Sequence, residues 1–407
     1  KLGVPAKTKH NEVAPCQHEL APIFDTTNVA IDHNLLTMEM MKKIAPKYGL
    51  VCLQHEKPFE GVNGSGKHNN WSMSTPTENL LDPGDTPMEN LQFLVFLAAV
   101  IKAVDEYADL LRTSVATPGN DHRLGANEAP PAVISIFLGD ELTAVLDAIE
   151  TDTPYSGTEK TVLKLGVHVL PKFTRDTTDR NRTSPFAFTG NKFEFRMVGS
   201  SDSIACANIM LNAAMAETLK EFSDRLEGVS DFESALHDLI KETIKAHKRI
   251  IFNGNGYDDA WIKEATEKRV LLNLRTTPDA LATVLEKKNV EMLTSLKIFS
   301  EAEIRSRYEI CLENYCKTVN IEGLTMVDMA RKEILPAVEA YLGDLSGTVA
   351  AKTAAVPGLA CKYEKDLISK LSKLADEISD AASSLDTTLI RLKAIPDVTD
   401  AAYVIRD

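Results

Sequence analysis

Residues 191–196 have the sequence Asn-Lys-Phe-Glu-Phe-Arg, in which charged and aromatic side chains alternate. Successive side chains of a β-strand point to opposite faces of a sheet. Phe193 and Phe195 therefore share one face, which suits a hydrophobic core. The opposite face carries Lys192, Glu194 and Arg196. This charged row is expected to face a cleft or solvent, and a solvated row of ion pairs is the simpler interpretation.

Strand-like runs also lie on the N-terminal side of this stretch, in a region rich in Gly, Pro, Asn and His. Two of them are 133–137 and 162–170, and apolar residues near helical spacing predict a helix over 88–111. From about Ser203 onward the pattern is almost entirely helical. Amphipathic helices are predicted over 231–251, 278–299, 301–318, 325–342 and 363–393.

The last of these helices has apolar residues alternately four and three positions apart, which is the spacing of a coiled-coil seam. The residues of this seam are Leu367, Leu371, Leu374, Ile378, Ala381 and Leu385. The seam predicts either an oligomer contact or a helical hairpin packed within the subunit, and we favour the hairpin. The chain as a whole is predicted to be an α+β protein with domains over 1–230 and 231–407.

Composition excludes several classes of function. The 407 residues are 44% hydrophobic and 26% charged, as in ordinary globular proteins. A net charge of −14 disfavours non-specific binding to nucleic acid, and no apolar run approaches the ~18 residues of a membrane span. Six scattered cysteines without a CxxC pair indicate a reducing, cytoplasmic compartment. Because dense polar motifs follow almost directly after Lys1, we expect an N-terminal part to be missing.

The first chemistry-bearing segment is HNEVAPCQHE, residues 10–19. Its two glutamates, Glu12 and Glu19, lie seven residues apart with Pro15 between them. A bent strand or a tight turn could bring both carboxylates onto one hard divalent cation, which prefers oxygen ligands. For the segment taken alone, two surface glutamates are the favoured interpretation.

The second segment, GVNGSGK over residues 61–67, matches the first seven positions of a Walker A loop. That motif requires Ser or Thr after the lysine and a helix to bind phosphate. Here His68 follows, and residues 69–74 have strand character. A phosphate-binding P-loop is therefore disfavoured. The alternative is a glycine loop that places its backbone against a small ligand, with His68 as a metal ligand at the start of a strand.

The third segment, NDHRLGANEAPP over residues 120–131, is polar and ends in two prolines. Arg123 could hold a carboxylate in a bidentate fork, and Glu128 lies where a mobile flap could carry it over a site. A surface loop with a salt bridge is the plainer interpretation. The fourth segment combines RNRTS, residues 180–184, with the alternating strand that contains Glu194.

Taken in order over about residues 8–212, these four segments resemble the glutamine synthetase family. EVAPCQHE resembles its first metal and glutamate motif, and NGSGKH its glycine loop with a metal-binding histidine. NDHRL resembles its glutamate-clamping arginine and flap, while NRT and KFEFR resemble its phosphate-binding arginine and last metal strand. The helical remainder, including FNGNGY, resembles the tail of the type III subfamily. The resemblance implies a curved antiparallel sheet with helices, followed by a mostly α-helical C-terminal region.

The resemblance also implies roles for individual residues. The metal ligands would be Glu12 and Glu19 for one cation, and His68 and Glu194 for a second. Groups that bind glutamate would be Asn63, Gly64 and Arg123. Residues near the nucleotide would be Ser72 and Asn70. Catalytic groups would be Glu128, Arg182 and Arg196.

The implied activity is ATP-dependent ligation of ammonia to L-glutamate, through γ-glutamyl phosphate, with two or more Mg²⁺ or Mn²⁺ ions per site. Phosphorylation gives the carboxylate a leaving group, and cations with arginines neutralise the transferring phosphoryl group. A γ-glutamyl ligase for another amine and an inactive scaffold are the alternatives. By resemblance the protein would be a dodecamer of two stacked hexameric rings, with further metal carboxylates on a strand before Lys1.

Three features depart from the more familiar members of the family. The interval from Arg123 to Glu128 is one residue shorter. Ala187 stands where a further phosphate-side arginine is found, and Asn70 where a histidine would lie near ATP. These departures leave the details of nucleotide contact open.

Overall fold

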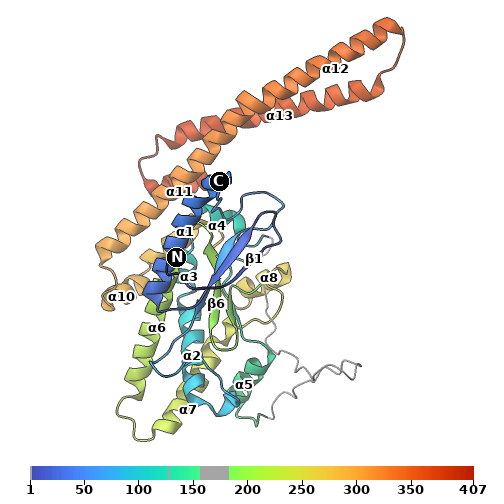
Figure 1. Cartoon of the computed structure of the whole chain (residues 1–407). Helices are drawn as coiled ribbons and strands as arrows, with labels where there is room; N and C mark the ends of the chain where they lie inside the picture. Colours follow the sequence, from blue (N-terminus) through green and yellow to red (C-terminus); the bar gives the residue numbers. More distant parts are fainter. Residues whose placement is uncertain (1, 127–128, 156–182) are drawn as a thin grey trace, which may run out of the picture. The chain divides into compact units, whose positions relative to one another are not determined.

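The computed structural model describes residues 2–126, 129–155 and 183–407 (Figure 1). The chain divides into two compact units, Lys1–Arg305 and Ser306–Asp407. The domain boundary predicted between residues 230 and 231 lies inside the first unit, between two of its helices, and stays a prediction. Among the described residues, no helix is both long enough and apolar enough to cross a membrane.

The first unit begins with a hairpin of two antiparallel strands, β1 (Ala6–Asn11) and β2 (His18–Pro22). Its tight connection includes Cys16 in the left-handed region, with φ of 59°, and Glu12 N donates to Gln17 O across it. Helix α1 (Thr27–Ile44) and the 3-10 turn η1 (Ala45–Tyr48) follow. The hairpin thus supplies the tight turn that the sequence allowed between Glu12 and Glu19.

The central sheet has four strands in the order β3 (Gly66–Trp71), β6 (Phe193–Gly199), β5 (Phe186–Phe188) and β4 (Ile136–Phe137). Three of the strands are antiparallel, but β4 runs parallel to β5, so the predicted antiparallel sheet is in fact mixed. Every residue of β6 is buried, and this strand has hydrogen-bonded neighbours on both sides. The predicted strand over 133–137 shortens to β4, and the one over 162–170 lies outside the described residues.

The aromatic face predicted for β6 forms part of the core. Phe193 and Phe195 are both buried, and their ring centroids lie 4.8 and 6.0 Å from that of Phe186 on β5. Such offset and tilted ring pairs stabilise a core beyond the area they bury. The sequence prediction for this face of the strand is confirmed.

Helix α2 (Leu91–Glu106) lies at the centre of the helical layer, where it packs against α6 (Ala205–Leu226) and α7 (Phe232–His247) (Figure 1). The Asn90 side chain caps its first turn by accepting from Phe93 N. Tyr107 leaves helical geometry, so the helix predicted over 88–111 is divided into α2 and α3 (Ala108–Thr113). The short helices α4 (Pro118–Arg123) and α5 (Asp140–Thr151) follow.

The remaining elements of the first unit are short. They are η2 (Pro87–Glu89), η3 (Lys248–Ile250), α8 (Asp259–Glu267), α9 (Thr277–Ala282), η4 (Thr283–Leu285) and α10 (Lys287–Ser295). The prediction of one helix over 278–299 is wrong, because Glu286 is extended between η4 and α10. The buried Asn289 side chain holds this break by donating to Thr283 O and to Asp109 Oδ2.

Helix α11 (Glu301–Met329) runs into the second unit, where η5 (Ala330–Ile334) and α12 (Leu335–Ala355) continue it without a break. The sequence predicted two separate helices, over 301–318 and 325–342. Pro336 has no N–H, and its ring crowds the preceding turn. The π-helical turn η5 lies directly before it and widens the helix there, which is a common way to accommodate such a position. The prediction of an interruption is therefore wrong.

Helices α12 and α13 (Lys362–Leu392) pack as an antiparallel hairpin (Figure 1), and α14 (Val398–Arg406) ends the unit. The hairpin interpretation of the predicted seam is confirmed, but its register differs. Ala375 and Ala382 are buried, whereas Leu374 is 42% exposed and Ala381 is also exposed. Both registers alternate by four and three and share every other position, so spacing alone could not separate them.

Candidate functional site

The hairpin β1–β2 brings three potential metal ligands together. His10 Nε2 lies 2.7 Å from Glu12 Oε1 and 2.8 Å from Glu19 Oε2. The register of the strands pairs His10 with Glu19, and His10 and Glu12 are two positions apart. One ligand atom from each residue lies within 4.8 Å of the others. Both glutamates were predicted as ligands from the sequence but His10 was not, although the alternation of side chains along a strand places it on the same face as Glu12.

A second group of charged residues lies where β3 and β6 run side by side. His68 Nδ1 lies 2.9 Å from Glu194 Oε1, while Arg196 donates from Nε and Nη2 to Glu194 Oε2 at 2.9 and 2.6 Å. The ladder between the strands is irregular between Lys67 and Asn69. The structure thus joins two predicted metal ligands that lie far apart in the sequence.

Two members of this second group are buried, whereas His68 is exposed. Glu194 is 8% exposed and Arg196 only 3%, so the interpretation of a solvated charged row is wrong for these two residues. Burial by itself raises the pKa of the Glu194 carboxyl. The hydrogen bond from His68 and the positive charge of Arg196 outweigh burial and lower this pKa to about 2. Glu194 is therefore an anion at neutral pH, as a metal ligand must be.

Arg123 is buried against backbone oxygens. It is 3% exposed, and its guanidinium donates to Arg196 O, Met197 O and Val198 O of β6 and to Asn120 Oδ1. Burial lowers its pKa to about 10. A Cβ at Gly66 would overlap this guanidinium, so Arg123 lies directly against the backbone that follows the glycine loop. The predicted grip of Arg123 on a substrate carboxylate stays a prediction.

The glycine loop, which we define as residues 61–65, leads directly into β3 and not into a helix. The loop therefore lacks the helix N-terminus with which a P-loop binds phosphate. Asn63 and Gly64 are both half-buried. A Cβ at Gly64 would lie 2.9 Å from Glu56 O and 3.1 Å from Arg123 Cγ, so the loop backbone packs closely against both residues. This packing places the two predicted glutamate-binding groups of the loop beside Arg123.

The two predicted nucleotide contacts lie at the far end of β3. Both side chains are exposed. Ser72 Oγ donates to Asn79 Oδ1 at 2.8 Å and to Asn191 O at 3.0 Å, while Asn70 Nδ2 donates to His68 O at 3.4 Å. The other two predicted site residues, Glu128 and Arg182, lie outside the described residues.

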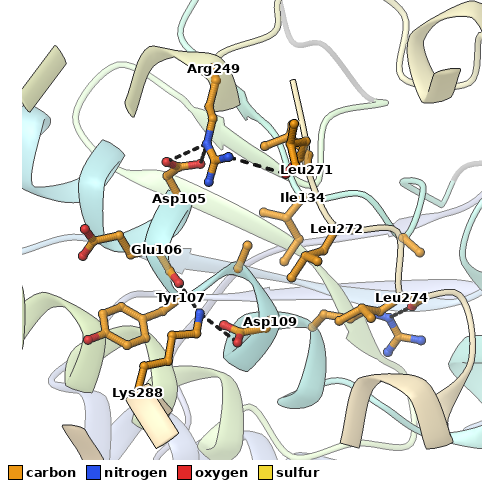
Figure 2. A pocket seen from close by; sticks show the side chains of 14 residues that line it. Asp105, Glu106, Tyr107, Asp109, Ile134, Arg249, Leu271, Leu272, Leu274 and Lys288 are labelled. Carbon is orange, nitrogen blue, oxygen red and sulfur yellow. Dashed lines mark hydrogen bonds and ion pairs between the residues drawn. The ribbon is translucent and has the colours of Figure 1, made fainter. Parts of the chain in front are cut away.

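A cavity of about 530 Å³ lies beside the C-terminal end of α2, and none of the predicted site residues lines it (Figure 2). Its acidic and basic side chains are already paired. Arg249 Nε lies 2.9 Å from Asp105 Oδ1, and Lys288 Nζ lies 2.9 Å from Asp109 Oδ2. The other two charged lining residues form ion pairs as well, Glu106 with Lys102 and Arg112 with Asp121. The cavity therefore offers a ligand no uncompensated charge.

Two family models match the chain. The model described as the catalytic domain of glutamine synthetase matches residues 1–132, and the model of the glutamine synthetase C-terminal domain matches residues 235–353. The chain belongs to the glutamine synthetase family. Its similarity to a type-3 glutamine synthetase, from Dictyostelium discoideum, reaches 50% identity over 86% of this chain and 48% of that protein.

A glutamine synthetase from Butyrivibrio fibrisolvens is 51% identical over 95% of this chain and 55% of its own length. The chain thus spans about half the length of the curated relatives it matches. Among solved structures, Plasmodium falciparum glutamine synthetase, determined by cryo-electron microscopy, aligns with a TM-score of 0.50 and 14% identity. The alignment covers 76% of this chain and 55% of that one. This likeness supports the α+β fold alone.

Proposed function

We propose that the protein to which this chain belongs ligates ammonia to L-glutamate at the expense of ATP, giving L-glutamine, ADP and phosphate through γ-glutamyl phosphate. The observation that carries the proposal is the meeting of His68, Glu194 and Arg196 on neighbouring strands. These residues come from two of the four segments that resemble the family, and both His68 and Arg196 contact the Glu194 carboxylate. The glycine loop stands immediately before the strand that holds His68.

The side chains present fit divalent cations. His10, Glu12 and Glu19 lie close enough together to bind one cation. A single nitrogen of His10 already contacts both carboxylates. Carboxylate oxygens with one imidazole suit Mg²⁺ or Mn²⁺. In this proposal these residues hold one cation, and His68 with Glu194 hold a second. When bound, such cations neutralise charge on the phosphates of ATP and on the transferring phosphoryl group.

Other residues of the chain bind and orient the reactants in this proposal. Asn63, Gly64 and Arg123 hold glutamate, and Ser72 and Asn70 lie near the nucleotide. Arg196 neutralises the phosphoryl group beside Glu194, together with Arg182. Glu128 closes the site and takes a proton from ammonium, because only neutral ammonia is a nucleophile.

We further propose that residues 1–230 form the catalytic domain and that 231–407 form a helical region that contributes to oligomer contacts. A homo-oligomer, specifically a dodecamer of two hexameric rings, remains a prediction from the family resemblance. A cytoplasmic location is supported by the six cysteines, all of which lie within the described residues and are free thiols.

The test is a coupled assay of ADP release on the full-length protein with glutamate and ATP, in which ammonium is compared with methylamine and with no amine. Glutamine formation that depends on ammonium supports the proposal. Turnover with methylamine but not ammonium would instead identify a γ-glutamyl ligase for another amine. A folded protein that releases no ADP under any of these conditions would indicate an inactive scaffold, which the retained metal and arginine residues argue against.

A further inference from the structure

Glu56 is a buried carboxylate in the segment just before the glycine loop. It is 2% exposed, and its Oε1 accepts from Ser201 N at 2.8 Å and from Ser201 Oγ at 2.6 Å. Burial of a carboxylate without compensation is unfavourable. Lys67 and Arg123 supply that compensation and share it with Asp202, because the negative charges of Asp202 and Glu56 both act on the two cations and oppose the lowering of their pKa by burial.

Two glycines make room for this carboxylate. A Cβ at Gly119, in the first turn of α4, would overlap Glu56 Oε2 and lie 2.9 Å from Cδ. A Cβ at Gly199, the last residue of β6, would overlap Oε1 and lie 2.9 Å from Cγ. Neither glycine has a positive φ, so lack of space and not backbone conformation excludes a side chain there. The carboxylate therefore lies directly on the backbone of both elements.

The backbone of the same residue holds the glycine loop. Glu56 O accepts from Ser65 N at 2.8 Å, which fastens the end of the loop to the segment before it. Lys67, on β3, also contacts the turn after β6. Its Nζ donates to Gly199 O, Ser200 O and Asp202 O. One residue thus joins the glycine loop, the start of α4 and the turn after β6.

We propose that Glu56 is a positioning residue for the glutamate subsite. The glycine loop carries Asn63 and Gly64. Helix α4 carries Arg123, and β6, which ends at Gly199, carries Arg196. The carboxylate and the backbone carbonyl of Glu56 fix the distance between the backbone of the glycine loop and Arg123, which lies against it. This inference rests on the proposed ligase function. It assigns Glu56 no contact with substrate.

The experiment uses the full-length protein with Glu56→Gln, which keeps the acceptor for Ser201 but removes the charge that balances Lys67 and Arg123. The KM for glutamate should rise about tenfold, because small displacements of positioning groups are costly. The KM for ATP should change less than about twofold, since the nucleotide residues lie at the other end of β3. Glu60→Gln, at an exposed glutamate outside the glycine loop, is the matched control and should behave like wild type.

Limited chymotrypsin digestion provides a measurement that does not need activity. Phe59 lies three residues after Glu56 and is 58% exposed. Relative to the rate for the same chain unfolded in urea, cleavage after Phe59 should be faster in Glu56→Gln and unchanged in Glu60→Gln if Glu56 anchors this segment. A thermal melt shows whether Glu56→Gln is folded, and the milder Glu56→Asp, which retains the charge, should restore part of the glutamate affinity.

The outcomes separate the two proposals. A wild-type protein without ligase activity would refute the proposed function and with it the glutamate assignment. An active wild type in which Glu56→Gln leaves the glutamate KM and the cleavage rate unchanged would refute the role of Glu56 alone. An equal rise in the KM for glutamate and for ATP, or a lower melting temperature with normal kinetics, would also overturn it, because both indicate a general structural role.

Discussion

The two candidate metal groups of this chain differ in the burial of their carboxylates. In the sheet group, Glu194 lies on a central strand, is nearly excluded from water and is held by the buried Arg196, whereas its other partner, His68, is exposed. The hairpin group consists of His10 and Glu19, both exposed, and the half-buried Glu12. Charge–charge interactions are stronger where water is excluded. The sheet group is therefore preorganised by the fold, whereas the hairpin group depends on local register alone.

The largest expected effect comes from breaking the sheet group. Glu194→Gln keeps the shape of the side chain but removes an anionic ligand, so glutamine synthesis by the full-length protein should fall about 1,000-fold, on the order of several kcal/mol in the barrier. Circular dichroism should show a folded protein. Near-normal turnover at saturating Mg²⁺ and Mn²⁺ would contradict the assignment of Glu194 as a metal ligand.

The same contrast between buried and exposed neighbours occurs on α13. Ala375→Leu should destabilise the protein by about 1–3 kcal/mol, because the extra methylenes have no room in the seam with α12. Leu374→Ala, at the exposed position one residue earlier, should change stability by less than about 0.5 kcal/mol. Urea denaturation of both variants tests the register, and the reverse ranking would favour the seam first predicted from spacing.

Stability should also respond to pH through Asp202, which lies beyond the end of β6. Burial first, and then the negative charge of Glu56, raise the pKa of this carboxyl from 3.8 to about 6. A raised folded-state pKa means that the folded protein binds the proton more tightly than the unfolded chain. Stability is therefore lost as pH rises from about 4 through 6. By pH 7 the loss should be on the order of 2–3 kcal/mol.

Asp202→Asn should abolish this contribution. The difference in unfolding free energy between Asp202→Asn and wild type should shift in favour of the variant between pH 4 and pH 7. Denaturant titrations at these two values provide the measurement. An identical pH dependence in both proteins would show that Asp202 titrates normally.

The smallest effect is expected at the hairpin. His10→Ala removes a neutral ligand from an exposed group, so the Mg²⁺ concentration that gives half-maximal activity should rise about tenfold, or about 1.4 kcal/mol, while turnover at saturating metal is nearly retained. His18→Ala is the control on the same hairpin, because the His18 ring hydrogen-bonds to Asn11 Oδ1 at 2.9 Å and lies outside the group formed by His10, Glu12 and Glu19. Equal responses of both variants would exclude His10 from the metal group.

Local patterns in the sequence predicted much of this molecule correctly. The alternation over 192–196 predicted a strand and its aromatic core face, because side-chain direction along a strand depends only on position. Replacement of the Walker Ser or Thr by His68 predicted a loop that leads into a strand. The four-and-three spacing predicted a packed helical hairpin. The spacing of Glu12 and Glu19 allowed their two carboxylates to meet, provided that the chain turned between them.

Tertiary structure alone decided which polar groups are buried and with what partners. Glu194 and Arg196 on the charged face of β6 are buried, and Arg196 finds its partners on Glu194 and on Ser184 O. Arg123 lies among carbonyl oxygens that come from residues far along the chain, and nothing near Glu56 in the sequence marks it as a buried carboxylate. Burial and charge compensation depend on which distant segments meet, and a local pattern does not contain that information. The sequence alone determined the directions of side chains, whereas the fold determined their surroundings.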